Sequence, residues 1–429
     1  MTDIMLAGRP FVPMDPLDVK VYQCGPTVYA APHLGNLRSA VVFDVLHRLL
    51  RTVYGEDHVR FVRNYTDVDS KIRAKALERG VPIGTITEEA IALYEDATGR
   101  LNIVEPIKPR ATETIPEMID MVSRLIDAGA AYETKGHVLF DRRKHPEFHL
   151  NTNIDPALMR EGEGNAYKRN PADFVLWKPT PADDAGWDSP WGRGAPGWHL
   201  ECSAMIGKIL GEQIDIHAGG IDLRFPHHEN ECAQTTTLTG KPLANHWLHN
   251  GMLEVDGKMS KSRGNVLLLE DALTRASPMG VRYFLLRGRY SEPLGLDADM
   301  DLVAESDTAF KRLERAHRKV LDVEPAGGLE EVADDLSTPE ALARAHTLAG
   351  MINDGSATSV DKAAFRGLLQ VLGLDVIQEI VLDDDAEQLV QARAAARAAR
   401  NFAEADRIRD LLVARGIEVA DGAIAKSPR

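Results

Sequence analysis

Two short motifs contain residues that could bind phosphate groups. The first, Pro32-His33-Leu34-Gly35-Asn36, stands where a strand-like stretch gives way to helical spacing. A helix N-terminus offers unpaired N–H groups and a positive dipole to an anion. His33 could donate a hydrogen bond to a phosphate or an adenine ring, and Gly35 would let a nucleotide approach the backbone closely. The simpler interpretation is a loop histidine that caps a helix.

The second motif is rich in lysine. Lys258-Met259-Ser260-Lys261-Ser262 follows Asp256-Gly257, a dipeptide typical of turns. Two lysines three residues apart can surround a polyphosphate and stabilise the charge that develops as pyrophosphate leaves. Lysines are also common in surface loops, so a solvated loop is the alternative for this motif alone.

A third group of residues could bind a metal ion. His227 and Glu231 are four residues apart on a predicted helix, so they share one face. The same spacing also fits a simple surface hydrogen bond. Cys24 and Cys202 each lie near a strand end or a helix start, in distant parts of the chain. Thiolate, imidazole and carboxylate groups are zinc ligands, but spacing alone does not bring these four residues together.

The elements around these residues predict an α/β fold. Val19 and Val21 alternate with polar residues as in a half-buried strand, Gly25 and Pro26 end that strand, and residues 40–50 have apolar residues at helical spacing. In an α/β sheet, chemistry lies beyond the carboxyl ends of the strands. Further strands are predicted at 59–65, 137–140 and 214–217, and further helices at 115–128 and 227–237.

Composition restricts the class of protein. The 429 residues predict two to four domains, with 44% apolar and 27% charged residues as in globular proteins. No segment approaches the roughly 18 uninterrupted apolar residues of a membrane span, and the N-terminus does not resemble a secretory signal. Three cysteines, an odd and low number, argue against a disulfide framework and fit a reducing cytoplasm. The net charge of −15 argues against a general nucleic-acid coat, but not against local basic patches.

The two phosphate motifs together resemble the signatures of class I aminoacyl-tRNA synthetases, with Asn36 where the first signature usually ends in histidine. Further ordered runs make the chain similar to the cysteinyl-tRNA synthetase family. The similarity extends, with gaps, from about residue 11 to about residue 417. These runs are residues 24–29, 66–69, 197–205, 217–220 and 226–231.

The resemblance implies an α/β fold of the class I type: a Rossmann-like parallel sheet with an insertion, then an α-helical bundle and a small C-terminal anticodon-binding domain. The expected domains are the first half of the catalytic nucleotide-binding fold (1–113), a connective insertion (114–195), the second catalytic half (196–252), a connecting domain with the lysine loop (253–310), the helical bundle (311–385) and the anticodon-binding domain (386–429).

The resemblance also implies site residues. One Zn²⁺ per chain would be bound by Cys24, Cys202, His227 and Glu231, and would bind the substrate thiolate, since a soft metal separates cysteine from serine better than shape does. Residues expected to bind the amino acid are Gly25, Thr27, Thr66, Trp198 and His228. ATP would contact Pro32, His33, Gly35, Asn36, Lys258, Met259, Ser260, Lys261 and Ser262, with His33, Asn36, Lys258 and Lys261 as the catalytic residues and Mg²⁺ beside the pyrophosphate.

The implied activity is ATP-dependent activation of L-cysteine to cysteinyl-AMP and its transfer to the 3′ end of cysteine tRNA, by a cytoplasmic monomer. An alternative is a paralogue that ligates activated cysteine to a non-tRNA amine or carrier. Residues 149–164 and the tail depart from the family pattern, and no Trp follows Trp247. Residues 401–416, in family-like form, favour tRNA.

A basic helical face is predicted near the C-terminus. Arg393, Arg397 and Arg400 are spaced i, i+4 and i+7 on one predicted helix. On an acidic protein such a face is a candidate for contacts with tRNA phosphates. The alternative is a solvated helix with ion pairs to Glu404 and Asp406.

Overall fold

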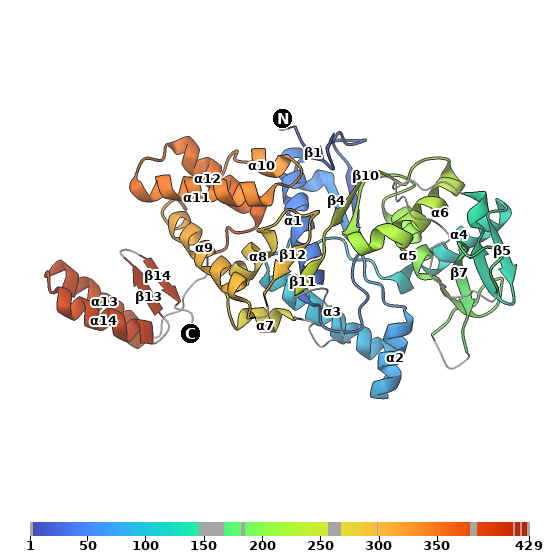
Figure 1. The fold of residues 1–429 in the computed structure, drawn as a ribbon, viewed down its shortest axis with the longest axis horizontal. Coiled ribbons are helices and arrows are strands. Elements are labelled where there is room, and N and C mark those ends of the chain that lie inside the picture. The colour runs from blue at the N-terminus through green and yellow to red at the C-terminus, as the bar shows by residue number, and fades with distance from the viewer. Residues whose placement is uncertain are drawn as a thin grey trace.

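The computed structural model describes residues 3–145, 167–181, 185–255, 267–297, 299–377, 384–414, 417–420 and 423–426. The lysine motif, residues 258–262, and the divergent stretch 149–164 lie outside the described residues. Figure 1 shows an elongated molecule, with the helix α1 near its middle, the insertion at one end and the C-terminal helices at the other.

The catalytic half of the chain is built on a parallel sheet of four strands in the order β10-β9-β3-β4. These strands are β3 (Val19–Gln23), β4 (Val59–Arg63), β9 (Ile214–Gly220) and β10 (Ala244–Asn250). Val21 of β3 is opposite both Phe61 and Ile216. The strand order reverses between β3 and β9, which places a crevice at their carboxyl ends. The predicted parallel sheet is therefore confirmed.

Helix α1 (Leu34–Tyr54) is the central helix of the main core. Its apolar positions recur at helical spacing, so Leu34, Leu37 and Val41 are fully buried. The helix packs against the sheet and against α8 (Pro278–Leu286) and α12 (Ser359–Leu372). Buried Asp44 forms an ion pair with buried Arg282 of α8. The start of α1, which carries the first motif, is thereby held by tertiary packing.

The insertion forms a second, antiparallel sheet in the order β5-β6-β7-β8. Its strands are β5 (Ala131–Thr134), β6 (His137–Phe140), β7 (Phe174–Pro179) and β8 (Gly194–Pro196), and β8 leads directly into α5 (Trp198–Ile209). Gly197 joins them and donates a backbone hydrogen bond to Leu176 at 2.8 Å. A Cβ atom on Gly197 would lie 2.0 Å from the carbonyl oxygen of Val175. This close approach fixes the start of α5.

The remaining elements connect and cover these sheets. Among the described residues they are β1 (Met5–Leu6), β2 (Arg9–Pro10), α2 (Ser70–Arg79), α3 (Ile83–Arg100), α4 (Ile115–Asp127), α6 (Glu229–Thr239), β11 (Leu253–Val255), α7 (Leu269–Leu273), β12 (Leu294–Leu296), α9 (Asp301–His317), α10 (Glu330–Ala333), α11 (Thr338–Asp354), α13 (Asp384–Ala398), α14 (Phe402–Ala414), β13 (Ile417–Ala420) and β14 (Ala423–Lys426). Helix α9 begins before the domain border expected at 310/311 and continues past it.

Two expected helices have different bounds. Helix α6 begins at Glu229, and His227 lies in the short segment Arg224–His228 that precedes it. The prediction that Arg400 shares a helix with Arg393 and Arg397 is wrong. Helix α13 ends at Ala398, and Arg400 has a left-handed backbone (φ 57°). The chain turns there because α13 and α14 pack against each other and bury Ala386, Ile408 and Leu412.

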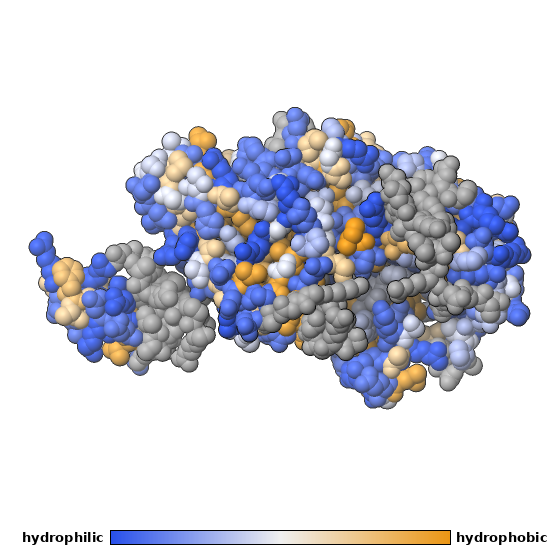
Figure 2. Space-filling model, viewed as in Figure 1, coloured by the Kyte–Doolittle hydropathy of each residue, from blue (hydrophilic) through white to orange (hydrophobic). Residues whose placement is uncertain are grey.

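The face of the molecule seen in Figure 2 is mainly hydrophilic. Figure 2 shows hydrophilic residues over most of one face, with apolar residues in small groups among them. Among the described helices, no segment combines the length and hydropathy that a membrane span requires.

Candidate active site and metal centre

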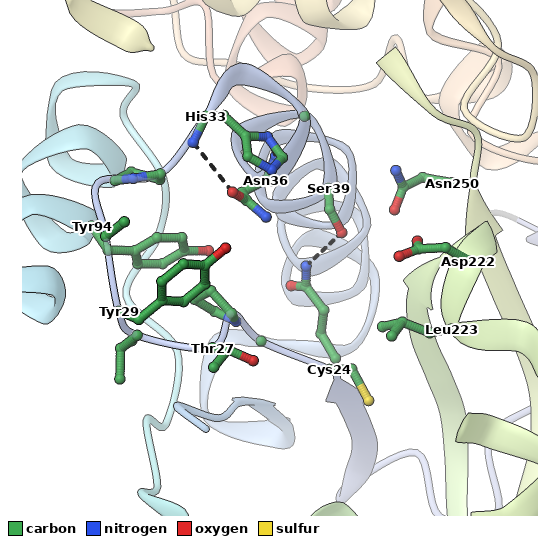
Figure 3. Close-up of a pocket in the computed structure, with 18 of the residues that line it drawn as sticks. Cys24, Thr27, Tyr29, His33, Asn36, Ser39, Tyr94, Asp222, Leu223 and Asn250 are labelled. Atoms are coloured by element: carbon green, nitrogen blue, oxygen red, sulfur yellow. Dashed lines mark hydrogen bonds between the residues drawn. The ribbon is translucent and has the colours of Figure 1, made fainter. Parts of the chain in front are cut away.

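A cavity of about 450 Å³ opens at the carboxyl edge of the central sheet. Figure 3 shows Cys24 at the end of β3, His33 and Asn36 at the start of α1, and Asp222, Leu223 and Asn250 across from Tyr29 and Tyr94. The walls therefore come from both halves of the sheet, as expected where the strand order reverses.

The first motif caps helix α1 reciprocally. The backbone N–H of Asn36 donates to His33 Nδ1, and the N–H of His33 donates to Asn36 Oδ1, both at 3.2 Å. This geometry is a capping box in which His33 is the N-cap. The helix-cap interpretation of His33 is thus correct, and it is compatible with anion binding because both residues also line the cavity.

Four buried side chains converge beside the cavity. Cys24, Cys202, His227 and Glu231 have ligand atoms within 4.8 Å of one another. The Cys24 sulfur lies 3.7 Å from Cys202 Sγ and 3.7 Å from Glu231 Oε1, and His227 Nε2 lies 2.9 Å from the same oxygen. Two sulfurs, one imidazole and one carboxylate can hold a metal ion, and the donor set fits tetrahedral zinc.

A second layer of aromatic and imidazole groups contacts two of these four residues, Glu231 and His227. His217 Nε2 lies 2.8 Å from Glu231 Oε2, so the two oxygens of Glu231 face different histidines. His199 Nδ1 lies 3.0 Å from His227 Nδ1. Trp198, whose side chain is 40% exposed, stacks on His227 with 4.2 Å between ring centroids. Such outer partners fix the direction of a metal ligand and tune its basicity.

The pKa values of Cys202 and Glu231 are lowered, which favours their deprotonated, metal-binding forms, whereas the pKa values of Cys24 and His227 are raised. Burial alone would lower the pKa of His227, but the Glu231 carboxylate raises it to about 10. The hydrogen bond from the Cys24 thiol lowers the pKa of Cys202 to about 6, while burial raises the pKa of Cys24. Burial alone would raise the pKa of Glu231, but His217 and His227 hold it well below its usual value. The Cys202 thiol therefore loses its proton more easily than the Cys24 thiol, and the neighbouring Glu231 carboxylate is charged.

Local sequence explains how Cys24 and His227 reach this point. Gly25 follows Cys24, and a Cβ atom there would lie 1.7 Å from the carbonyl oxygen of Asn64. Gly25 also donates a backbone hydrogen bond to Asn64 Oδ1 at 2.9 Å. His227 is one helical turn from Glu231 because His228 already has helical backbone angles. The close β3–β4 approach and this turn bring both ligands to the sheet edge.

The structure brings most of the predicted site residues together. Lining the cavity are Gly25, Thr27, Pro32, His33, Gly35, Asn36, Trp198 and Cys24. Thr66 is buried behind Thr27, with which it forms an isolated parallel bridge. His228 adjoins the metal cluster: its ligand atom lies within 4.8 Å of those of Cys24, His217 and Glu231, a second group that could hold a metal ion. Its Nδ1 is 2.9 Å from His249 Nε2. Lys258, Met259, Ser260, Lys261 and Ser262 lie outside the described residues.

Arg393 and Arg397 lie on α13, far along the chain from this cavity, and Arg400 lies in the turn that follows. The ion pairs of Glu404 and Asp406 are made by Arg407 and Arg409. Contacts of Arg393, Arg397 and Arg400 with tRNA stay a prediction.

Sequence reasoning missed several residues of the site. Gln23, Ser39, Tyr94, Asp222, Leu223, Asn250, Gly251 and Met252 also line the cavity. His217 was not singled out, although it ends the predicted strand 214–217 and so stands where an α/β sheet places chemistry. The place of His217 at the end of that predicted strand was the feature that could have identified it. Tyr94, from the middle of α3, carried no such signal.

Comparison with solved structures shows the fold class. Methionyl-tRNA synthetase of Mycobacterium tuberculosis, in complex with methionyl-adenylate, matches with a TM-score of 0.54 at 18% identity over 91% of this chain and 87% of that one. The Agrobacterium radiobacter K84 agnB2 LeuRS, from a ternary complex with tRNA and LeuAMS, matches with a TM-score of 0.61 at 10% identity over 85% and 84%. The chain has the class I aminoacyl-tRNA synthetase fold.

Sequence comparison identifies the family within that class. Residues 10–305 match the family model described as "tRNA synthetases class I (C) catalytic domain". The chain is 47% identical to the cysteine–tRNA ligase of Parvibaculum lavamentivorans, over 96% of this chain and 93% of that protein. It is 46% identical to the cysteine–tRNA ligase of Caulobacter sp. (strain K31), over 96% and 95%. The chain belongs to the cysteine–tRNA ligase family.

Proposed function

We propose that this protein activates L-cysteine with ATP and transfers it to the 3′ end of cysteine tRNA. The observation that carries the proposal is the buried Cys24–Cys202–His227–Glu231 cluster beside a cavity that reaches the capped start of α1. Relatives named for the same reaction, at 46–47% identity along nearly the whole chain, support it. They give no support to the alternative of an amine or carrier acceptor.

The reaction needs positioning more than a protein nucleophile. A cysteine carboxylate oxygen would form a bond to the α-phosphorus of ATP while the bond to the β-phosphate oxygen breaks, which gives cysteinyl-AMP and pyrophosphate. A terminal tRNA hydroxyl would then attack the carbonyl carbon and release AMP. His33, Asn36 and the start of α1 would hold the phosphates. Gly25, Thr27 and Trp198, with Thr66 and His228 behind them, would enclose the amino acid.

The lysine motif would hold the leaving pyrophosphate together with Mg²⁺. Its described flanks support this role. The strand β11 ends just before the motif, and the backbone N–H of Leu34, the first residue of α1, donates to the carbonyl of Leu267 at 2.9 Å. The described residues on both sides of the motif, β11 and Leu267, therefore lie close to α1.

Zn²⁺, one per chain, is the proposed metal. When bound, it would take up the substrate thiolate as a ligand and so distinguish cysteine from serine, which has a harder oxygen. Cys24 and Cys202 would supply thiolates, His227 an imidazole and Glu231 a carboxylate. His217 would keep the Glu231 carboxylate oriented toward the ion.

Domain borders are proposed at 113/114, 195/196, 252/253, 310/311 and 385/386, as the resemblance to the family implies. The C-terminal unit that begins with α13 would contact the tRNA anticodon region, with Arg393, Arg397 and Arg400 as candidate phosphate contacts. The protein would act as a monomer in the cytoplasm. Light scattering after size exclusion would test the monomer.

Cysteine-dependent exchange of labelled pyrophosphate into ATP tests the first step. We expect exchange with cysteine and far weaker exchange with serine at equal concentration. Absence of cysteine-dependent exchange by metal-loaded protein would contradict the proposal.

A further inference from the structure

Arg38 makes an unusual set of contacts just behind the cavity. It lies on α1 two residues after Asn36, and its side chain is fully buried. Its Nη1 donates to the carbonyl oxygens of Gly251 and Met252 at 2.7 and 2.9 Å. Its Nη2 donates to the carbonyl oxygens of Arg289 and Glu292 at 3.1 and 2.7 Å. One guanidinium thus joins α1 to two other chain segments.

The first of these segments is part of the cavity wall. Gly251 and Met252 line the cavity and connect β10 to β11. Asn250 Nδ2 donates to the same Gly251 carbonyl at 3.1 Å, so that oxygen accepts two hydrogen bonds. Arg38 therefore connects this wall directly to the first turns of α1.

The second segment, residues 289–292, supports the first from behind. Gly251 donates its N–H to the Tyr290 carbonyl at 2.7 Å, and Leu294 donates to the Met252 carbonyl at 2.8 Å. A Cβ atom on Gly251 would lie 2.2 Å from the Glu292 carbonyl oxygen. The contact between Gly251 and residues 290–292 therefore leaves no space for a side chain at position 251.

The charge of Arg38 is balanced by carbonyl dipoles in these four contacts. Burial lowers the pKa of Arg38 to about 10, so the group stays charged at neutral pH. A planar fork of donors fits four fixed carbonyls, and the ammonium of lysine does not. Arg282 is also fully buried, but it pairs with Asp44, and its carbonyl partners, Leu101, Asn102 and Leu372, do not line the cavity.

We propose that Arg38 is a positioning residue for ATP. It holds the Gly251–Met252 wall at a fixed place relative to His33 and Asn36. Both sides of the cavity can then bind one nucleoside triphosphate at the same time. The inference rests on the proposed binding of ATP in this cavity. Arg38 itself does not contact the nucleotide, and its substitution should not affect the metal cluster or the cysteine pocket.

Arg38→Lys tests this directly, with Arg48→Lys as the matched control. Arg48 lies on the same helix and also donates to backbone carbonyls, those of Asn102 and Gln370, away from the cavity. For R38K we expect kcat/KM for ATP in cysteine-dependent pyrophosphate exchange to fall about 10- to 100-fold, the usual cost of misplaced reacting groups. Bound metal per chain, and cysteine binding measured by equilibrium dialysis without ATP, should match the wild type. R48K should leave all three unchanged.

Wild-type ATP kinetics in folded R38K would overturn the inference. So would an equal loss of ATP and cysteine binding, since that would mean a general structural role. If R38K is unfolded at the assay temperature, the same three quantities are measured for R38K, R48K and the wild type at a lower temperature at which the circular dichroism of all three agrees. Wild-type protein in the same assay separates the two proposals: no exchange there contradicts the proposed function, whereas exchange unaffected in R38K contradicts only the role of Arg38.

Discussion

The sulfur atoms of Cys24 and Cys202 lie 3.7 Å apart, although the residues are 178 positions apart in the sequence. One ends the strand β3, and the other lies in the second turn of α5. The separation is too long for a disulfide, whose sulfurs are about 2 Å apart. It fits two ligands of one ion, together with His227 and Glu231. The pair brings the end of β3 and the helix α5 to the same metal cluster.

Replacing Cys202 should therefore remove the metal. In Cys202→Ser, one soft ligand of four is lost, and we expect metal per chain to fall to a small fraction of the wild-type value after dialysis against a chelator. Cys232→Ser is the control, because Cys232 is also buried but lies outside the cluster. Elemental analysis measures both. Equal metal retention in the two variants would contradict the assigned ligand set.

Removing the outer partner of Glu231 should weaken metal binding without abolishing it. In His217→Gln the contact with Glu231 Oε2 is lost or weakened, and loss of such partners typically costs 10- to 100-fold in metal affinity, so we expect about that fall. Competition with a chromogenic chelator gives the affinity. His246→Gln, on the neighbouring strand β10 and outside the metal cluster, should have wild-type affinity. An unchanged affinity in H217Q would mean that His217 does not orient the carboxylate.

The two roles of Asn36, helix capping and phosphate binding, can be separated. Asn36→Asp keeps an acceptor for the His33 N–H and adds a negative charge at a helix N-terminus, which stabilises helices by about 0.3–1 kcal/mol. We expect an unfolding free energy at or above that of the wild type, together with a raised KM for ATP, because the carboxylate repels phosphate. Urea unfolding and exchange kinetics measure the two effects. A normal KM would exclude Asn36 from phosphate binding.

The buried pair of Asp44 and Arg282 should make stability depend on acid. Burial alone would raise the pKa of Asp44, but Arg282 and Arg48 lower it below 3.8. Because the folded-state pKa is depressed, the stabilisation is present above the unfolded-state pKa and is lost as pH falls through the folded-state value. Arg282→Met removes one of the two arginines that pair with buried Asp44, and Arg48 Nε still lies 2.8 Å from Asp44 Oδ2. We therefore expect a loss below the roughly 3–5 kcal/mol that leaving a buried charge without any partner costs.

Urea unfolding at neutral pH and at progressively lower pH tests this pair. The Arg282→Met variant should be destabilised at neutral pH, and the difference from the wild type should shrink at low pH. A constant difference would mean that the lost packing of Arg282, rather than its charge, sets its contribution.

Local patterns in the sequence predicted local structure well. The alternation of Val19 and Val21, the breakers Gly25 and Pro26 and the apolar spacing after Asn36 all correspond to β3, the loop and α1. They could not predict that His33 and Asn36 cap each other, since both residue types fit several loop geometries. Arg400 was placed on a helix by spacing alone, whereas Asn401 begins the next helix by accepting a hydrogen bond from Glu404 N–H.

Such local patterns do not predict contacts between segments that are distant in the sequence. Cys24 and Cys202 could be joined only through the family resemblance, because spacing does not encode which strands are neighbours. Arg38 was not detected, since its partners are backbone carbonyls of residues 251–292, which any sequence offers. His217 could have been found from its place at the end of the predicted strand 214–217, although β9 continues to Gly220. Its contact with Glu231 required the fold.

Charging of tRNA is the most direct test of the central claim. Zinc-loaded protein is incubated with bulk tRNA, ATP and labelled cysteine, with cysteine-dependent pyrophosphate exchange run alongside, and acid-precipitable label is counted. We predict that label enters tRNA in an ATP-dependent reaction and that unlabelled serine does not compete. Exchange without transfer to tRNA would contradict the assignment of tRNA as the acceptor, and the absence of both would contradict cysteine activation itself.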